Sequence, residues 1–312
     1  MIRKRHSDTI DIVGANGDFC RITDPDLTWG PYLAQGSKGL YDLAIQSNWG
    51  NYSFGQYYQS NKPKRRDVVW TIHLINPETG TPLDRDEHLW HILYSRWKAM
   101  FSASKEATVV YRSLDGDRTL GLRKTAGDQS FSTQNFEGID PHHFAYGSIV
   151  QTMGAELPYY VGTPIKDEIQ FDGAGNFWGK LSYYNPSTVD TFAQWDVTYG
   201  AAYVLPDYSY GNPIFGAAIA DGGKTVLTPQ IVETDGNVTI YTRPDMETYV
   251  SENDTPVGLR AGGRDWDYPI PAGAGEINDG CTVRAINVAD GCAIKLTIPT
   301  WYDSPFSTPT VF

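Results

Sequence analysis

The sequence lacks long apolar runs and is poor in positive charge. No stretch approaches the ~18 consecutive apolar residues that cross a bilayer. The chain carries 25 Lys and Arg against 37 Asp and Glu, so its formal net charge is −12. Such a chain has little cationic surface to neutralise nucleic-acid phosphates or to anchor on anionic lipid. We therefore expect that DNA could pass near this protein without being bound by it.

Cysteine is also scarce, because the 312 residues include only Cys20, Cys281 and Cys292. A two-residue hairpin is expected at Asp290-Gly291, and it would hold Cys281 and Cys292 on the order of 25 Å apart along the strands. A disulfide needs Cα atoms within about 7 Å. The spacing does not match a metal site either. We expect three buried or free thiols, no metal and no cofactor.

Aromatic and turn-forming residues are abundant, with 9 Trp, 20 Tyr, 31 Gly and 19 Pro. This mixture favours strands separated by tight turns, and it also suits surfaces that bind sugars or proteins. Apolar and polar residues alternate over residues 39–46 and 65–75, which predicts two strands. Strands at 108–114 and 118–124 flank a hairpin signal at Asp115-Gly116-Asp117.

One helix is predicted over residues 85–102, with Asp84 as the N-cap and Glu87 completing a capping box. Its apolar residues recur at helical spacing, so one face is expected to pack on a sheet. Periodicity then fades over residues 127–164, and a connection of this length predicts a domain boundary. The expected domains are 1–155 and 156–312.

The second half is predicted to be strands and turns only, apart from one helical turn near residues 246–251. Short strands punctuated by turn signals indicate a β-sandwich. The predicted strands are 177–184, 191–205, 225–228, 237–242, 258–260, 265–270, 281–288 and 292–298. The fold class is therefore mainly β with one prominent helix: an α+β or β-sandwich domain followed by a second β-sandwich.

Few residues form a pattern that could carry catalysis. His88 and His91 are three apart on the helix, whereas a zincin needs histidines at i and i+4. The adjacent His142 and His143 would diverge in an extended chain. The loop at 172–176 contains Gly-x-Gly but no helix follows it to receive a phosphate.

Asp265 and Asp267 lie on one side of a predicted strand, ~6.6 Å apart along it. Glycoside hydrolysis needs paired carboxylates across a cleft, and no second acidic cluster completes one. We predict no catalytic residues, and a chain of this length without a catalytic cluster favours a binding or structural module. The large aromatics Trp70, Trp90 and Trp97 are expected in the first domain's core or at subunit contacts.

Several short motifs carry a family resemblance when taken in order. They are Ala107-Thr108-Val109-Val110-Tyr111, Asp115-Gly116-Asp117-Arg118, Tyr184-Asn185-Pro186, Gln194-Trp195-Asp196-Val197, Leu205-Pro206-Asp207, Lys224-Thr225-Val226-Leu227-Thr228-Pro229, Thr242-Arg243-Pro244-Asp245, Tyr268-Pro269-Ile270-Pro271 and Ile298-Pro299-Thr300-Trp301-Tyr302-Asp303-Ser304-Pro305-Phe306. In this order and spacing the sequence resembles the distal tail proteins of long-tailed phages that infect actinobacteria. The resemblance covers most of the chain.

The resemblance implies a non-enzymatic virion protein located at the distal end of the tail and assembled in the host cytoplasm. It implies a tail-tube-like domain at 1–155 with the helix near 85–102, and a galectin-like β-sandwich at 156–312. The implied assembly is a hexameric ring that joins the tail tube to the hub or baseplate. Implied neighbours are the tail tube, hub, tape measure and receptor-binding or other minor tail proteins.

Two further expectations concern ligands. An acidic inner wall of such a ring would repel DNA and let the genome slide through it during ejection. The alternative to the tail protein is a carbohydrate-binding β-sandwich module or a glycosidase-like protein, and a host glycan remains a possible partner in either case.

Overall fold

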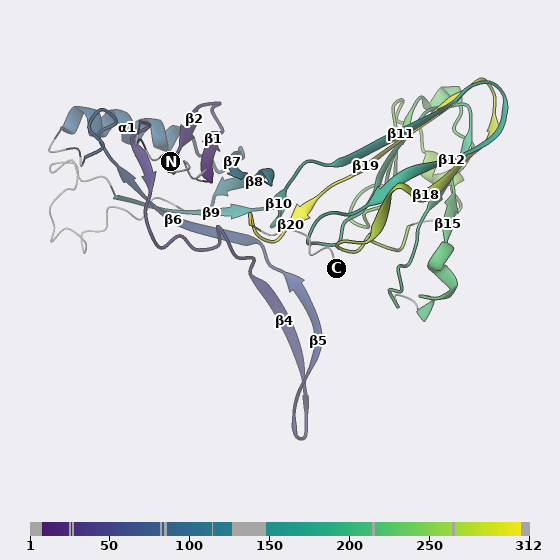
Figure 1. Ribbon diagram of the computed structural model, residues 1–312, viewed down its shortest axis with the longest axis horizontal. Coiled ribbons are helices and arrows are strands. Elements are labelled where there is room, and N and C mark those ends of the chain that lie inside the picture. Colours follow the sequence, from purple (N-terminus) through teal and green to yellow (C-terminus); the bar gives the residue numbers. More distant parts are fainter. Residues whose placement is uncertain are drawn as a thin grey trace, which may run out of the picture. The chain divides into compact units, whose positions relative to one another are not determined.

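A computed structural model describes residues 8–24, 26, 28–81, 83, 86–113, 115–126, 148–213, 216–263 and 266–306, apart from the side chains of residues 52 and 58–62. The chain forms two compact units (Figure 1). Unit 1 combines Met1–Gly162 with a return segment, Tyr302–Ser307, and unit 2 contains Thr163–Trp301. In the described residues, neither α-helix has the length and apolar content of a membrane-spanning segment.

Unit 1 is built on one antiparallel sheet. Its strands follow the order β2 (Phe19–Arg21), β1 (Thr9–Val13), β7 (Ala107–Ser113), β8 (Gly116–Lys124), β9 (Ser148–Ala155), β6 (Arg66–Leu74) and β3 (Pro31–Leu33). The backbone N–H of Leu33 donates to the carbonyl of Ile22 at 2.7 Å, so the two ends of the sheet approach each other. Two short strands, β10 (Tyr160–Val161) and β20 (Trp301–Tyr302), extend it beside β8. The hairpin predicted from Asp115-Gly116 joins β7 and β8, with Ser113 opposite Gly116.

Helix α1 (Glu87–Ala99) begins two residues later than predicted. The carboxylate of Asp86 caps it by accepting the backbone N–H of Leu89 at 2.9 Å. The prediction of Asp84 as N-cap is therefore wrong, and Asp84 itself lies outside the described residues. Asp84 and Asp86 are two positions apart, and the side chain of either could accept a backbone N–H of the first helical turn. In the helix that begins after Asp86, Trp90, Leu93 and Trp97 are buried.

The interior of unit 1 is centred on a polar group shared by two tryptophans. The indole N–H groups of Trp70 and Trp97 both donate to the Gln151 side-chain oxygen, at 3.3 and 3.1 Å. Phe101 packs on both rings, with centroids 6.0 and 4.8 Å away. Gln151 belongs to β9, within the span 127–164 that the sequence predicted to be a connection. That part of the prediction is wrong, since β9 is a central strand of the sheet.

The return segment is held on unit 1 by two arginines. The buried Arg66 guanidinium donates to the carbonyls of Pro158 at 2.7 Å and Leu40 at 3.2 Å, and also to that of Asp303. The Arg118 guanidinium donates to the Ser304 carbonyl at 3.0 Å. Backbone carbonyls thus satisfy a buried cation, and the segment that follows unit 2 becomes part of unit 1.

A buried carboxylate joins β1 to its two neighbouring strands. Asp11 accepts from Arg21 of β2 and from Arg112 of β7, each at 2.7 Å. Burial alone would raise the pKa of Asp11, but the hydrogen bonds and charges of the two arginines outweigh it and hold that pKa below its usual value. Because the folded pKa is depressed, this stabilisation is present above the unfolded pKa of about 4 and is lost as the pH falls through the folded value.

Asp11→Asn is therefore expected to lower the free energy of unfolding at pH 7 by about 2–3 kcal/mol. Breaking a fully buried ion pair costs more, but here both arginine guanidiniums are partly exposed to water. The variant should also lose part of the acid sensitivity below about pH 4. Urea unfolding at pH 7 and pH 3 measures both effects. Asp117→Asn is the control, because Asp117 pairs with the same Arg112 at the surface. An exposed ion pair of this kind contributes less than about 1 kcal/mol to stability. Equal losses in the two variants would contradict the assignment.

Unit 2 is a sandwich of two antiparallel sheets. One has the order β11 (Ile165–Phe171), β19 (Cys292–Ile298), β13 (Gln194–Val197), β16 (Val238–Tyr241) and β17 (Tyr249–Ser251). The other has the order β12 (Gly175–Tyr184), β18 (Gly275–Val288), β14 (Ala202–Pro206) and β15 (Thr225–Leu227). Alternate residues of both sheets enter one core, which includes Trp195 from the first and Tyr203 from the second. The predicted sandwich is confirmed.

Several local predictions in unit 2 are wrong. In the predicted strand 265–270, the described residues 266–270 form no strand and make only an isolated bridge at Ile270. Residues 257–260 form a short helix, α2 (Val257–Arg260), where a strand was predicted. Tyr249–Ser251 is strand β17 where a helical turn was predicted. The turn at Asp290-Gly291 does not close a hairpin, because β18 and β19 belong to different sheets. Cys20, Cys281 and Cys292 are free and buried, and burial raises the pKa of the Cys20 and Cys281 thiols to about 12.

Candidate assembly surface

A two-stranded ribbon projects from the rest of unit 1. Strands β4 (Ile45–Tyr52) and β5 (Gly55–Pro63) pair with each other and form a sheet of two strands (Figure 1). At ~3.3 Å per residue, the eight residues of β4 reach about 26 Å. We call this ribbon, residues 45–63, the assembly hairpin.

The local sequence explains how the assembly hairpin folds without a core. Tyr52 pairs with Gly55, so Ser53 and Phe54 form a two-residue turn, and Gly55 has a φ of 138° that favours glycine. Gly50 pairs with Tyr57, and a Cβ on Gly50 would lie 2.4 Å from two atoms of the Tyr57 ring. The ring therefore covers the glycine, and a larger residue at position 50 would displace it.

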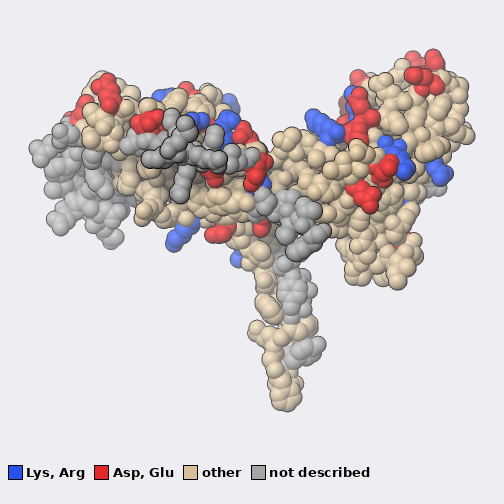
Figure 2. All heavy atoms as spheres, viewed as in Figure 1, with Lys and Arg blue, Asp and Glu red and all other residues tan. Residues whose placement is uncertain are grey.

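The assembly hairpin is uncharged over most of its length. No Asp, Glu, Lys or Arg occurs in residues 43–61, although charged residues make up 20% of the chain. Its described part shows neither red nor blue atoms in Figure 2. The segment is instead rich in Tyr, Asn, Ser, Gln and Gly with one Trp, which is close to the composition of antibody contact loops. Such residues make large contacts at low cost in conformational entropy.

Large apolar side chains on the assembly hairpin face solvent. Phe54 is fully exposed at the tip, Trp49 is 54% exposed, and Ile45 is 57% exposed at the base. A lone two-stranded hairpin is at best marginally stable in water. Its outer edges also present backbone groups that another chain can pair with. Edge strands of natural proteins often carry charged side chains that prevent such pairing, and residues 45–61 have none. The arrangement fits a surface that another protein subunit covers.

The sequence did not predict the assembly hairpin. The alternation over residues 39–46 predicted one strand, but β4 begins near the end of that range. A ribbon exposed on both faces has no apolar–polar alternation, which is the signal for a strand. The absence of charge over residues 43–61, together with the aromatic residues, is the feature that could have revealed it.

The structure places the three tryptophans singled out from the sequence in the interior of unit 1. Trp70, Trp90 and Trp97 are all buried, and all pack in the same hydrophobic core. Trp90 lies on α1 and stacks on Tyr94 with ring centroids 4.9 Å apart. In this chain the three indoles are parts of the core.

The other residues considered from the sequence do not form a catalytic constellation in the described residues. His88 and His91 lie exposed on α1, and no group of three or more His, Cys, Asp or Glu is placed to hold a metal in the part of the chain that is described. Asp267 forms an ion pair with Lys224, whose ammonium also contacts the buried Asp207 at 2.7 Å. Asp265, His142 and His143 lie outside the described residues.

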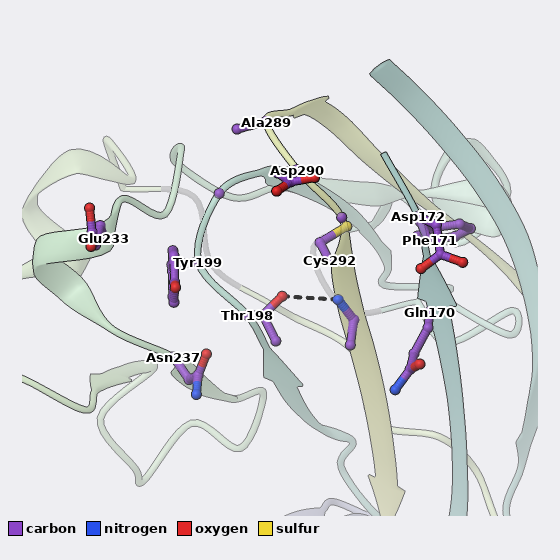
Figure 3. A pocket seen from close by; sticks show the side chains of 13 residues that line it. Gln170, Phe171, Asp172, Thr198, Tyr199, Glu233, Asn237, Ala289, Asp290 and Cys292 are labelled. Atoms are coloured by element: carbon purple, nitrogen blue, oxygen red, sulfur yellow. Dashed lines mark hydrogen bonds between the residues drawn. The ribbon is translucent and has the colours of Figure 1, made fainter. Parts of the chain in front are cut away.

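A cavity of about 600 Å³ opens at one end of the unit 2 sandwich. Asp172 comes from the turn between β11 and β12, Tyr199 and Asp290 come from loops, and Glu233 begins a single 3-10 turn (Figure 3). The three carboxylates lie on different sides of the cavity in Figure 3, and only Thr198, which accepts the backbone N–H of Ala293 at 2.9 Å, makes a drawn hydrogen bond. This cavity offers no convergent set of groups for a reaction.

Comparison with solved structures finds the fold of this chain in phage tail proteins. The Dit protein of phage SPP1, described as a paradigm of the hub adsorption apparatus in phages that infect Gram-positive bacteria, is 9% identical. The match covers 93% of this chain and 98% of that chain, with a TM-score of 0.50. The similarity establishes the fold: mainly β, with one prominent helix.

Two structures of the phage p2 baseplate in its activated conformation, with Sr and with Ca, also match. They are 11% and 12% identical, each covers 96% of this chain and 99% of that chain, and each has a TM-score of 0.47. No protein-family model and no curated protein matches the sequence.

Proposed function

We propose that this chain is a structural subunit of a phage tail tip, a distal tail protein that works by assembling and not by catalysis. The single observation that carries the proposal is the shared fold with SPP1 Dit over 93% of this chain and nearly all of that one. The match extends over both units of this chain, so the likeness is not limited to one of them.

The proposed assembly is a closed hexameric ring at the distal end of the tail. A ring requires a heterologous interface, in which one surface of a subunit meets a different surface of its neighbour. The assembly hairpin supplies one such surface, because it is aromatic, has no charged residue from 45 to 61, and pairs with no third strand in the described residues. Its exposed Phe54 and Trp49 are the anchors that a neighbouring subunit would bury.

The proposed neighbours follow from this place in the particle. The ring would join the tail tube on one side to the hub or baseplate on the other, with the tape measure and receptor-binding or other minor tail proteins beside it. The host would be an actinobacterium, on the resemblance of the sequence motifs. With a net charge of −12, the subunits would let DNA pass through the ring without binding it.

Immunogold electron microscopy of phage particles that carry this chain tests the location. An antibody against the full chain is expected to label the distal end of the tail and no other part of the particle. Labelling of the capsid, or particles without the chain, would contradict the proposal. Particles stripped of their tails serve as the control for antibody specificity.

A further inference from the structure

Four side chains form a row across the outer face of the four-stranded sheet of unit 2. In the strand register, Trp178 of β12 lies opposite Arg284 of β18, and Arg284 lies opposite Val204 of β14. Val204 in turn lies opposite Leu227 of β15. Alternate residues point to opposite faces of a strand, so these four share the face turned away from the core. With strands ~4.8 Å apart, the row is about 14 Å long.

The row combines an exposed aromatic ring with an uncompensated cation. Trp178 is 68% exposed, and Arg284 is exposed beside it. Within the described residues, no carboxylate or other partner is recorded for the Arg284 guanidinium, although the chain carries 37 acidic side chains. Lys180 follows on the same face of β12 and has only a surface contact of 3.2 Å with Asp279. In the described residues this part of the outer face therefore carries one unpaired cation, Arg284, beside the Lys180–Asp279 ion pair.

We propose that this row binds an acidic saccharide. The indole of Trp178 presents a flat apolar face on which the C–H face of a sugar ring can pack. The Arg284 guanidinium lies one strand away and matches the two oxygens of a sugar carboxylate, with which it forms paired charge-assisted hydrogen bonds. Thr282, the cross-strand partner of Lys180, adds a hydroxyl two residues from Arg284 on the same face of β18. A carboxylated glycan therefore complements both the shape and the charge of the row.

The polar surroundings favour a glycan over a protein partner. Lys180, Ser182 and Thr282 surround the single tryptophan on this face, and protein–protein interface cores are depleted in Lys and Ser. The assembly hairpin has the opposite character, with several aromatics and no charged residue from 45 to 61. This inference does not depend on the ring, since the row lies within unit 2.

Isothermal titration calorimetry of the full chain with two matched probes tests the proposal. The first is oligogalacturonate, and the second is the same oligosaccharide with its carboxylates methyl-esterified, which keeps the sugar and removes the charge. The acidic probe is expected to bind about 10- to 100-fold more tightly than the ester, the ratio expected for one charge-assisted contact. Equal affinity for the two probes, or no binding of the acidic one, would overturn the proposal.

Two variants assign the binding to the row. Arg284→Gln is expected to remove most of the preference for the acidic probe, whereas Trp178→Ala is expected to weaken both probes at least 10-fold. The controls are Tyr199→Ala, an exposed aromatic at the end cavity, and Lys295→Gln, an exposed cation on the other sheet. Controls that weaken binding as much as the row variants would refute the site. So would row variants that bind the probes normally but fail to co-assemble with other tail proteins, since the row would then be a protein interface.

Discussion

A chain carrying Trp49→Lys and Phe54→Asp is expected to fold normally and to remain a monomer. Both side chains lie exposed on the assembly hairpin, so neither change removes a core contact. Each aromatic, if buried by a neighbouring subunit, is an anchor whose loss costs about 2 kcal/mol or more, and an uncompensated charge at that interface costs further. The two substitutions together should weaken each subunit contact at least 1,000-fold. Analytical ultracentrifugation measures the change.

The matched control is Ile219→Asp together with Leu259→Lys. Ile219 and Leu259 are as exposed as the hairpin aromatics, but they lie in unit 2. This control chain should assemble like the unmodified one. If the hairpin variant still forms rings, or if the control loses them equally, the assembly hairpin is not the subunit contact.

Trp97→Ala is expected to destabilise the chain by about 3–5 kcal/mol, the usual cost of truncating a buried Trp. Trp97 is 1% exposed, and its ring lies 6.1 Å from that of Trp70 and 4.8 Å from that of Phe101. Removing it leaves a cavity between α1 and the sheet. Urea unfolding followed by far-ultraviolet circular dichroism measures the loss.

Two companion variants separate packing from hydrogen bonding. Trp97→Phe keeps most of the volume and loses the N–H donor, and Gln151 still accepts from Trp70, so the expected loss is about 1–2 kcal/mol. Trp178→Ala removes an indole that is 68% exposed and should cost less than about 0.5 kcal/mol. A Trp97→Ala loss below about 1 kcal/mol would contradict the burial of this side chain.

The sequence predicted correctly those elements that bury one face, because their apolar residues recur at a regular spacing, or that have a strong turn signal. Helix α1 has its apolar residues at helical spacing, and the β7–β8 hairpin has a strong turn signal, so both were found. Strand β9 was missed because Gln151 occupies a core position, where it accepts hydrogen bonds from two tryptophans instead of packing as an apolar residue. A polar residue at a buried position removes the alternation that predicts a strand.

Other errors arise because a turn does not determine where the next strand pairs. The Asp290-Gly291 turn indicated a hairpin, yet the chain crosses from one sheet of the sandwich to the other at this point. The predicted strand 191–205 is likewise two strands, β13 and β14, in different sheets. The sheet that each strand joins depends on its pairing with strands that are distant in the sequence.

The candidate sites show the same limit. The row from Trp178 to Leu227 is assembled from four strands, and only the register of the folded sheet brings Arg284 beside Trp178. The assembly hairpin has no buried face, so periodicity gives no signal for it. Its composition gives the signal instead, because residues 43–61 contain no charged side chain although the chain as a whole is acidic.

Native mass spectrometry of the purified full chain shows whether the chain assembles as one segment of a closed ring. We expect a species of six times the 34.7 kDa chain mass, accompanied in negative-stain images by rings with sixfold symmetry. A single species at 34.7 kDa at every protein concentration tested would contradict the ring.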